Sequence, residues 1–218
     1  MKAMNRKWRN CIFSAVIGVV VIVMIVTGPV ATTLQLRSHW APPAHSVDVV
    51  YLVCGARAQG RRLQTLKAWL APTQRPDSQT TRIWIGNDTQ NSLWSRKHQR
   101  NLTRAEWATR FATNHFPEHE IKIVPGAFTN TDGEMHALAK ALQNHADIQT
   151  IALVTCGFHA RRTVQRFTKH ADESVEIMII PVIPHWENRA PWIVLAEWLK
   201  MIRDHFNLTH HPWVSRQA

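Results

Sequence analysis

Five short apolar runs alternate with segments of helical periodicity, and this alternation constrains the fold more than any other feature. The runs have the length of buried strands, and the segments between them place apolar residues at the spacing of helices packed on a sheet. The expected strands are 47–53, 82–86, 121–124, 150–155 and 175–182, and the expected helices are 61–70, 103–116, 131–142, 159–170 and 192–206. Such alternation is typical of an α/β protein with a mainly parallel sheet covered on both faces.

The beginning of the chain has the pattern of a membrane anchor. Residues 1–10 contain four basic residues and no acidic residue, and residues 11–31 are uncharged and mostly apolar. A membrane-spanning helix needs about 20 residues, whereas the apolar region of a secretory signal peptide has about 7 to 15. The sequence therefore predicts an uncleaved transmembrane helix over 11–31. The positive-inside rule places the basic tail in the cytoplasm and the rest of the chain across the membrane.

The remaining chain divides into three parts. Residues 32–46 contain Pro42-Pro43 and lack sustained periodicity, which indicates a linker. Residues 47–206 are expected to form the α/β domain, and residues 207–218 a C-terminal tail. Within the domain, residues 87–92 are rich in turn formers and are expected to be a polar loop.

Charge and cysteine content restrict the classes of partner and cofactor. The net charge is +11, from 26 Lys and Arg against 15 Asp and Glu, which would suit nucleic acid, acidic lipids or phosphorylated substrates. The basic residues are scattered among acids and match no nucleic-acid-binding motif, so we expect no nucleic-acid partner. Three cysteines fit no zinc spacing, and Pro117 interrupts the helical pair His115 and His119, so we expect no metal site.

The strand at 150–155 ends in a cluster that suits an anion. Thr155, Cys156 and Gly157 follow the apolar run, and His159 and Arg162 come next, where a helix is expected to begin. Ligands of parallel sheets bind at the carboxyl ends of strands, and the N–H groups at a helix start favour a phosphate. The pattern therefore predicts a phosphate-sized anion site. The alternative is an ordinary strand-to-helix turn with solvated arginines and a hydrogen-bonded histidine.

Three elements in the same order resemble a known family. The first is the strand and turn 49–55, followed by Arg61 or Arg62. The second is Asn130-Thr131 with Glu134, and the third is the run 153–162, in which Phe158-His159 precedes Arg162. On these elements, the chain from about residue 47 to residue 206 resembles the YdcF-like family of bacterial envelope proteins, the domain of unknown function 218 family, which includes the SanA and ElyC groups.

The resemblance implies a Rossmann-like, doubly wound domain behind one N-terminal helix in the bacterial inner membrane, with the domain in the periplasm. It also implies a role in envelope integrity or in polysaccharide or lipid-carrier metabolism. Binding of S-adenosylmethionine is implied for one branch only, so the cofactor stays open. The second strand departs from the family pattern, because Ile85-Gly86-Asn87-Asp88 stands where Ser-Gly-Gly is usual. The departure puts in doubt any ligand contact made by that glycine pair.

A shared ligand site follows if the first and fourth strands are neighbours. His159 would protonate a leaving oxygen or activate water. Glu134, a candidate base, and Glu106 would hold the arginines. The alternative for both acids is a structural role in a first helical turn, where the dipole favours a carboxylate. The expected ligand-binding residues are Cys54, Gly55, Arg61, Arg62, Asn130, Thr131, Thr155, Cys156 and Arg162.

These features favour a membrane-anchored envelope-biogenesis protein that binds, and hydrolyses or transfers, a phosphorylated or lipid-linked envelope precursor. Two alternatives stay open: a non-catalytic envelope assembly factor that works through protein contacts, and a domain that binds a nucleotide or S-adenosylmethionine. If the first and fourth strands are adjacent, Cys54 and Cys156 would also lie close enough for a disulfide in an oxidising compartment.

Overall fold

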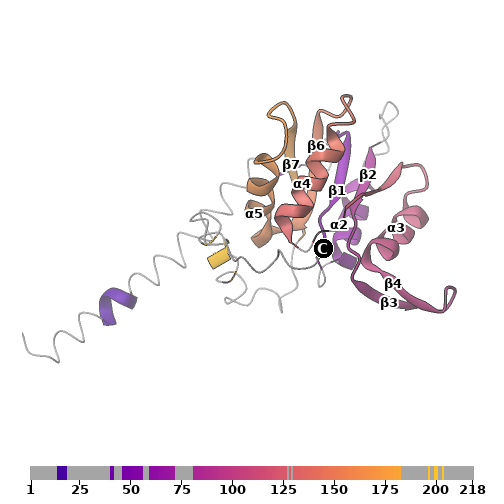
Figure 1. The fold of residues 1–218 in the computed structure, drawn as a ribbon, viewed down its shortest axis with the longest axis horizontal. Helices are drawn as coiled ribbons and strands as arrows, with labels where there is room; N and C mark the ends of the chain where they lie inside the picture. Colours follow the sequence, from indigo (N-terminus) through magenta and orange to yellow (C-terminus); the bar gives the residue numbers. More distant parts are fainter. Residues whose placement is uncertain are drawn as a thin grey trace, which may run out of the picture. The chain divides into compact units, whose positions relative to one another are not determined.

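The computed structural model describes two compact units, which we treat separately: residues 36–185, and residues 1–35 together with 186–218. In the first unit it describes residues 40–41, 46–55, 59–71, 81–126, 128 and 130–182. In the second unit it describes only residues 14–18, 196, 199–200 and 203. The domain that carries the sheet is drawn in Figure 1.

The domain is built on a parallel sheet of five strands. Their order across the sheet is β5-β2-β1-β6-β7. From the central strand β1 the chain first builds the sheet towards β5 and then returns to build β6 and β7 on the other side. The prediction of a parallel α/β sheet is confirmed, and its order is that of a Rossmann-like fold. The strands are β1 (Val49–Leu52), β2 (Arg82–Gly86), β5 (Ile121–Val124), β6 (Thr150–Cys156) and β7 (Glu176–Val182).

The first and fourth of the expected strands, β1 and β6, are neighbours. Val49 pairs with Ile151 and Leu52 pairs with Val154 in parallel register. The reversal of strand order therefore falls between β1 and β6, which is the position where sheets of this kind bind ligands.

Helices cover both faces of the sheet. The helices α2 (Gln59–Leu70) and α3 (Arg104–His115) share one apolar cluster with the sheet, to which Leu66 and Ala112 belong. The helices α4 (Thr131–Leu142) and α5 (Gly157–Thr168) share the other, which contains Tyr51, Leu138 and Phe167. Neighbouring strand residues point to opposite faces, so Val50 and Leu52 lie in the first cluster and Val49 and Tyr51 in the second.

Capping side chains fix where two helices begin. Thr103 and Glu106 form the expected capping box of α3, and Asn130 caps α4 by accepting a bond from the N–H of Gly133 at 2.8 Å. The helix α5 begins at Gly157, two residues before the expected start. Of the expected helix 192–206, the structure describes only residues 196, 199, 200 and 203, which are helical.

An antiparallel hairpin that was not predicted lies between β2 and α3. Its strands are β3 (Asn91–Ser95) and β4 (Arg100–Thr103), and Trp94 pairs with Asn101. Gln99, with a φ of 51°, closes the turn between them. Residues 87–90 form the expected polar loop, whereas residues 91–92 already belong to β3. The hairpin itself was not predicted, because an exposed two-stranded ribbon needs few apolar residues and then lacks the alternating pattern of a strand.

The domain also begins earlier than expected. Trp40 forms a parallel bridge with Ile179, and the N–H of Ala41 donates to the carbonyl of Ile179 at 2.9 Å. Part of the expected linker 32–46 therefore belongs to the sheet edge beside β7.

The predicted anchor lies mostly outside the described residues. Residues 14–18 of the expected span 11–31 are helical. Among the residues that the structure describes, no helix is long and apolar enough to cross a membrane. Tails 1–10 and 207–218 also fall outside the described residues.

Asp48 fixes the register of β1 and β6 at their amino ends. Its Oδ2 accepts bonds from the N–H groups of Gln149 and Thr150, at 2.9 and 2.8 Å, and from the Thr150 hydroxyl at 2.9 Å. This carboxylate thus connects two strands that are distant in sequence.

We predict that Asp48→Ala lowers the free energy of unfolding by about 1 to 3 kcal/mol, because partly buried donors lose their acceptor. Urea unfolding of the full chain measures this change. Glu173→Ala removes an exposed acid and is the control, with an expected change within about 0.5 kcal/mol. Equal effects of the two substitutions would contradict the role given to Asp48.

Candidate functional site

Arg62 connects the carboxyl ends of β1 and β6. It comes from the first turn of α2 and is only 4% exposed. Its guanidinium donates to the carbonyl of Val53, and its Nη2 lies 4.0 Å from the sulfur of Cys156. The structure therefore places Arg62 at the predicted meeting point, whereas Arg61 lies half-buried on α2.

The turn after β1 needs a glycine. Gly55 has a φ of 157°, and a Cβ on it would lie 2.8 Å from Nη1 of Arg62. The turn is therefore shaped by a buried guanidinium that packs directly against its backbone.

Glu134 holds the same turn from the opposite face of the sheet. It lies in the first turn of α4 and is 3% exposed. Its Oε1 accepts bonds from the N–H of Cys54 at 2.6 Å and from the hydroxyl of Tyr51 at 3.1 Å. Burial raises the pKa of Glu134, although these two donors and nearby Arg62 oppose the rise. Glu134 is thus placed to fix the end of β1.

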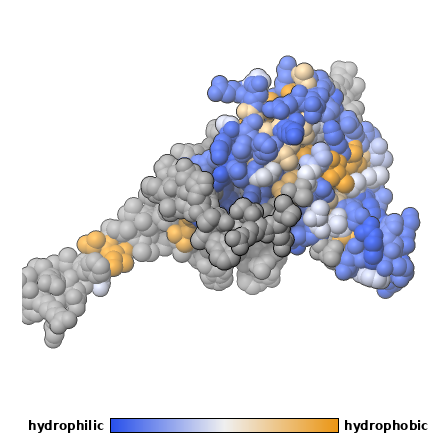
Figure 2. All heavy atoms as spheres, viewed as in Figure 1, coloured by the Kyte–Doolittle hydropathy of each residue, from blue (hydrophilic) through white to orange (hydrophobic). Residues whose placement is uncertain are grey.

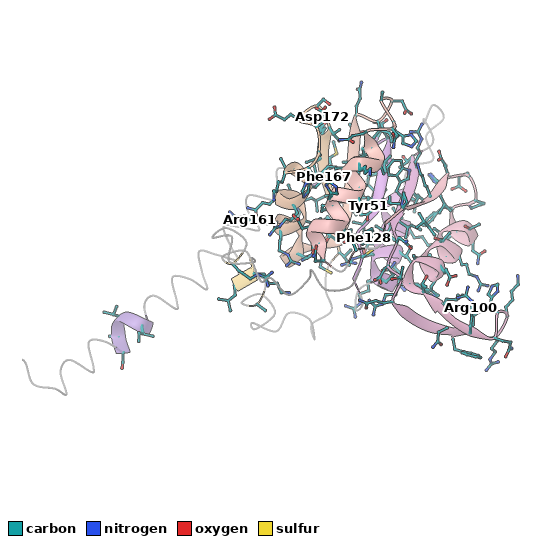
Figure 3. All side chains as sticks on the ribbon, viewed as in Figure 1. Tyr51, Arg100, Phe128, Arg161, Phe167 and Asp172 are labelled. Atoms are coloured by element: carbon teal, nitrogen blue, oxygen red, sulfur yellow. The ribbon has the colours of Figure 1, made fainter. Side chains whose placement is uncertain are left out.

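Tyr51 was not predicted as part of the site. It is the only tyrosine of the chain and is fully buried between the sheet and α4 (Figure 3). Burial and the neighbouring Glu134 carboxylate raise the pKa of its hydroxyl well above the ordinary value. A tyrosine in the middle of an otherwise aliphatic strand was the available signal, because a buried hydroxyl requires a partner.

Gly86 is a second residue of this site that was not predicted from the sequence. A Cβ on it would collide with the Cys54 sulfur, lie 2.6 Å from the Tyr51 hydroxyl and lie 3.0 Å from Oε1 of Glu134. The end of β2 therefore provides the space that the Glu134 contacts occupy. This close approach explains a glycine here without any contact to a ligand.

A second group joins the starts of α4 and α5. Nη2 of Arg162 donates to the Thr131 hydroxyl at 2.9 Å and lies 3.5 Å from Nδ1 of His159. The structure thus brings Thr131, His159 and Arg162 together as expected. Asn130 lies beside them, and its side chain caps α4.

The start of α5 lacks a capping side chain. Cys156 precedes the helix without a side-chain capping bond, and the first turn contains no acidic residue. A Cβ on Gly157 would meet no atom within 4 Å. Thr155 is fully buried, and its hydroxyl has no hydrogen-bond partner in the described part of the chain. The first N–H groups of a helix have no acceptor within the helix, and the buried Thr155 hydroxyl comes two residues before this helix start.

Cys54 and Cys156 are free thiols, so the disulfide expected between them in an oxidising compartment is not formed. Burial, followed by the charge of Glu134, raises the pKa of Cys54 far above the ordinary range. A neutral thiol is a poor nucleophile and a poor metal ligand. Cys54 therefore contributes its backbone N–H to the site rather than reactive sulfur.

Glu106 is bound to a different arginine from those expected. Its carboxylate pairs with Arg100 of β4 at 2.6 and 2.9 Å and accepts the N–H of Thr103 at 2.8 Å. Arg100, and then Thr103, lower the pKa of Glu106 to about 2. Its observed contacts tie the hairpin to α3 rather than holding Arg61, Arg62 or Arg162.

Comparison with known proteins finds no matching protein-family model and no matching curated protein. In the described residues, no three His, Cys, Asp or Glu side chains are arranged to hold a metal ion. The chemistry available from the geometry is that of anion binding by an arginine, a hydroxyl and backbone N–H groups. His159 adds a proton donor or acceptor beside them.

We predict that Glu134→Ala lowers the free energy of unfolding by about 2 to 4 kcal/mol, because two buried donors lose their acceptor. Glu134→Gln keeps an acceptor oxygen and serves as the matched variant, with a smaller loss. Urea unfolding measures both. An alanine variant as stable as the glutamine variant would contradict the bonds assigned to Oε1.

The same pair of proteins tests the raised pKa of Glu134. A raised pKa means that the folded state binds the proton more tightly than the unfolded state. The stability of the natural protein relative to Glu134→Gln should therefore be greatest below about pH 4.5 and fall as the pH rises through the folded pKa. A difference that stays constant between about pH 4 and pH 8 would contradict the raised pKa.

Proposed function

We propose that the α/β domain binds a phosphorylated ligand at the carboxyl ends of β1 and β6. The observation that carries the proposal is the start of α5, which lacks a side-chain cap and lies beside the Thr155 hydroxyl, His159 and Arg162. A phosphate can accept bonds from helix N–H groups and a hydroxyl at once, and the helix dipole favours its charge.

Arg162 is the main ionic contact in this proposal. Its guanidinium donates to the neutral hydroxyl of Thr131, and arginine forms stronger, charge-assisted bonds with phosphate oxygens. A ligand phosphate would therefore compete well for the same N–H groups. The buried Arg62 would add positive potential from behind the turn.

His159 and Glu134 take different roles. His159 lies in the first turn of α5, close to Arg162, where an imidazole can protonate a leaving oxygen or activate water. Glu134 bonds the backbone behind the turn, so we assign it to positioning rather than to proton transfer.

The substrate class in our proposal comes from the sequence. The apolar stretch 11–31 would hold the domain at a membrane, and the resemblance to the YdcF-like proteins points to the bacterial periplasm. We therefore propose a phosphorylated, lipid-linked envelope precursor as the ligand. The rival proposal is an assembly factor that acts through protein contacts, and a nucleotide or S-adenosylmethionine binder is the third.

Calorimetric titration of the full chain in detergent with inorganic pyrophosphate and with a short prenyl phosphate tests ligand binding. We predict that Arg162→Ala weakens both affinities by about tenfold or more, the effect of losing a hydrogen bond to a charged group. Arg166→Ala, one helical turn further on, removes an arginine paired with Asp132 and is the control. Equal affinities in all three proteins would contradict the site.

Release of inorganic phosphate from the prenyl phosphate separates the enzyme from the binding protein. Turnover that is lost in His159→Ala while affinity is kept would support a catalytic histidine. Turnover unchanged in that variant would contradict the role of His159, and binding without turnover would favour the assembly factor.

A further inference from the structure

The β3–β4 hairpin has no part in the proposed ligand site, yet it belongs to a strongly basic stretch of the chain. No acidic residue occurs from 89 to 105, and the same stretch contains Arg96, Lys97, Arg100 and Arg104. The hairpin begins after the carboxyl end of β2, so it extends from the edge of the sheet at which the ligand site lies (Figure 1). Figure 2 shows a hydrophilic surface over this part of the domain.

One face of the hairpin is covered by α3. Nη1 of Arg110 on α3 donates to the Ser95 hydroxyl at 3.3 Å, and Arg100 forms its two-bond ion pair with Glu106. Ser95 and Leu102 are accordingly buried, with 8% and 4% exposure. These contacts fix the hairpin on α3 and determine which side chains point outward.

The opposite face combines an aromatic ring with a basic tip. Side chains alternate along a strand, so Trp94 and its ladder partner Asn101 point away from α3. Trp94 is 59% exposed, the highest value among the exposed large apolar side chains described. The tip, residues 96–99, is exposed throughout and carries Arg96 and Lys97.

We propose that the outward face of the hairpin, formed by Trp94, Arg96 and Lys97, docks on a bilayer that contains anionic lipids. Tryptophan favours the boundary between hydrocarbon and water, because its ring is apolar and its N–H is polar. Lysine and arginine beside it are attracted to anionic headgroups. The surface therefore has both components that a peripheral membrane contact requires.

The geometry favours lipid over nucleic acid. Surfaces that bind single-stranded nucleic acid stack successive bases on several rings along a basic groove, whereas Trp94 is the only Phe, Trp or Tyr between residues 89 and 105. The inference rests on the hairpin and not on the ligand site. If both are correct, docking would turn the site-bearing edge of the sheet towards the membrane.

Amide hydrogen exchange of the full chain with lipid nanodiscs tests the proposal. We expect amides of residues 93–101 to exchange at least about fivefold more slowly with nanodiscs containing about 30% phosphatidylglycerol than with pure phosphatidylcholine, the effect expected for one basic residue at an anionic surface. The double substitution Arg96→Glu/Lys97→Glu should abolish the difference, and Trp94→Ala should reduce protection.

A control double variant, Lys140→Glu/Lys169→Glu, makes the same change in net charge. Both lysines are exposed and lie at the carboxyl ends of α4 and α5, away from the hairpin, so hairpin protection should remain. Thermal melting confirms that each variant folds, and the comparison of the two lipids in the natural protein needs no variant.

Equal protection in the two lipids would overturn the proposal, as would protection that survives reversal of Arg96 and Lys97. The same protection by a single-stranded oligonucleotide without lipid would also overturn it and assign the surface to nucleic acid. Because no phosphorylated ligand is added, these outcomes are independent of the titrations at the β1 and β6 ends.

Discussion

The buried carboxylate of Glu134 is the interaction on which the rest of the site depends. It joins α4 to the end of β1 through the N–H of Cys54 and the hydroxyl of Tyr51. A buried carboxylate is unfavourable unless donors surround it, so the fold must bring both donors to it. Gly86 leaves room for these contacts, because a side chain at this position would overlap the Tyr51 hydroxyl and the Glu134 carboxylate. Helix, central strand and neighbouring strand are thereby fixed together at one edge of the sheet.

The opposite face contributes a second buried charge at the same edge. Arg62 bonds the carbonyl of Val53, immediately before the N–H that Glu134 accepts. The backbone at the end of β1 is therefore held from both faces, by the carboxyl group of Glu134 on one and the guanidinium of Arg62 on the other. A turn held in this way is preorganised. The donors at the start of α5 lie on the adjoining strand connection, beyond this fixed frame.

Local sequence patterns predicted the strands and helices of the domain well. The strands 82–86 and 121–124 and the helix 131–142 have the predicted bounds, because buried apolar runs and capping residues are local signals. The capping box at Thr103 and Glu106 also followed from spacing alone. The sequence analysis assigned Thr131, His159 and Arg162 to one ligand site, and the structure brings these three side chains together.

What the sequence did not predict depends on contacts between distant residues. Tyr51 and Glu134 are 83 positions apart, and no local pattern relates them. The partner of Glu106 was assigned to the wrong arginine, because the intervening hairpin that supplies Arg100 was not recognised. The hairpin escaped recognition because only one of its faces packs against the domain. Its apolar residues are therefore too few to give an alternating pattern.

The central claim is that an anion binds where α5 begins. A crystal structure of the protein soaked with tungstate, a heavy analogue of phosphate, tests it most directly, because the anomalous signal locates the ion without any assumption about the ligand. The account predicts tungstate within hydrogen-bonding distance of the first N–H groups of α5, with the Arg162 guanidinium turned from Thr131 towards it. Tungstate bound elsewhere, with the start of α5 empty and Arg162 still on Thr131, would contradict the account.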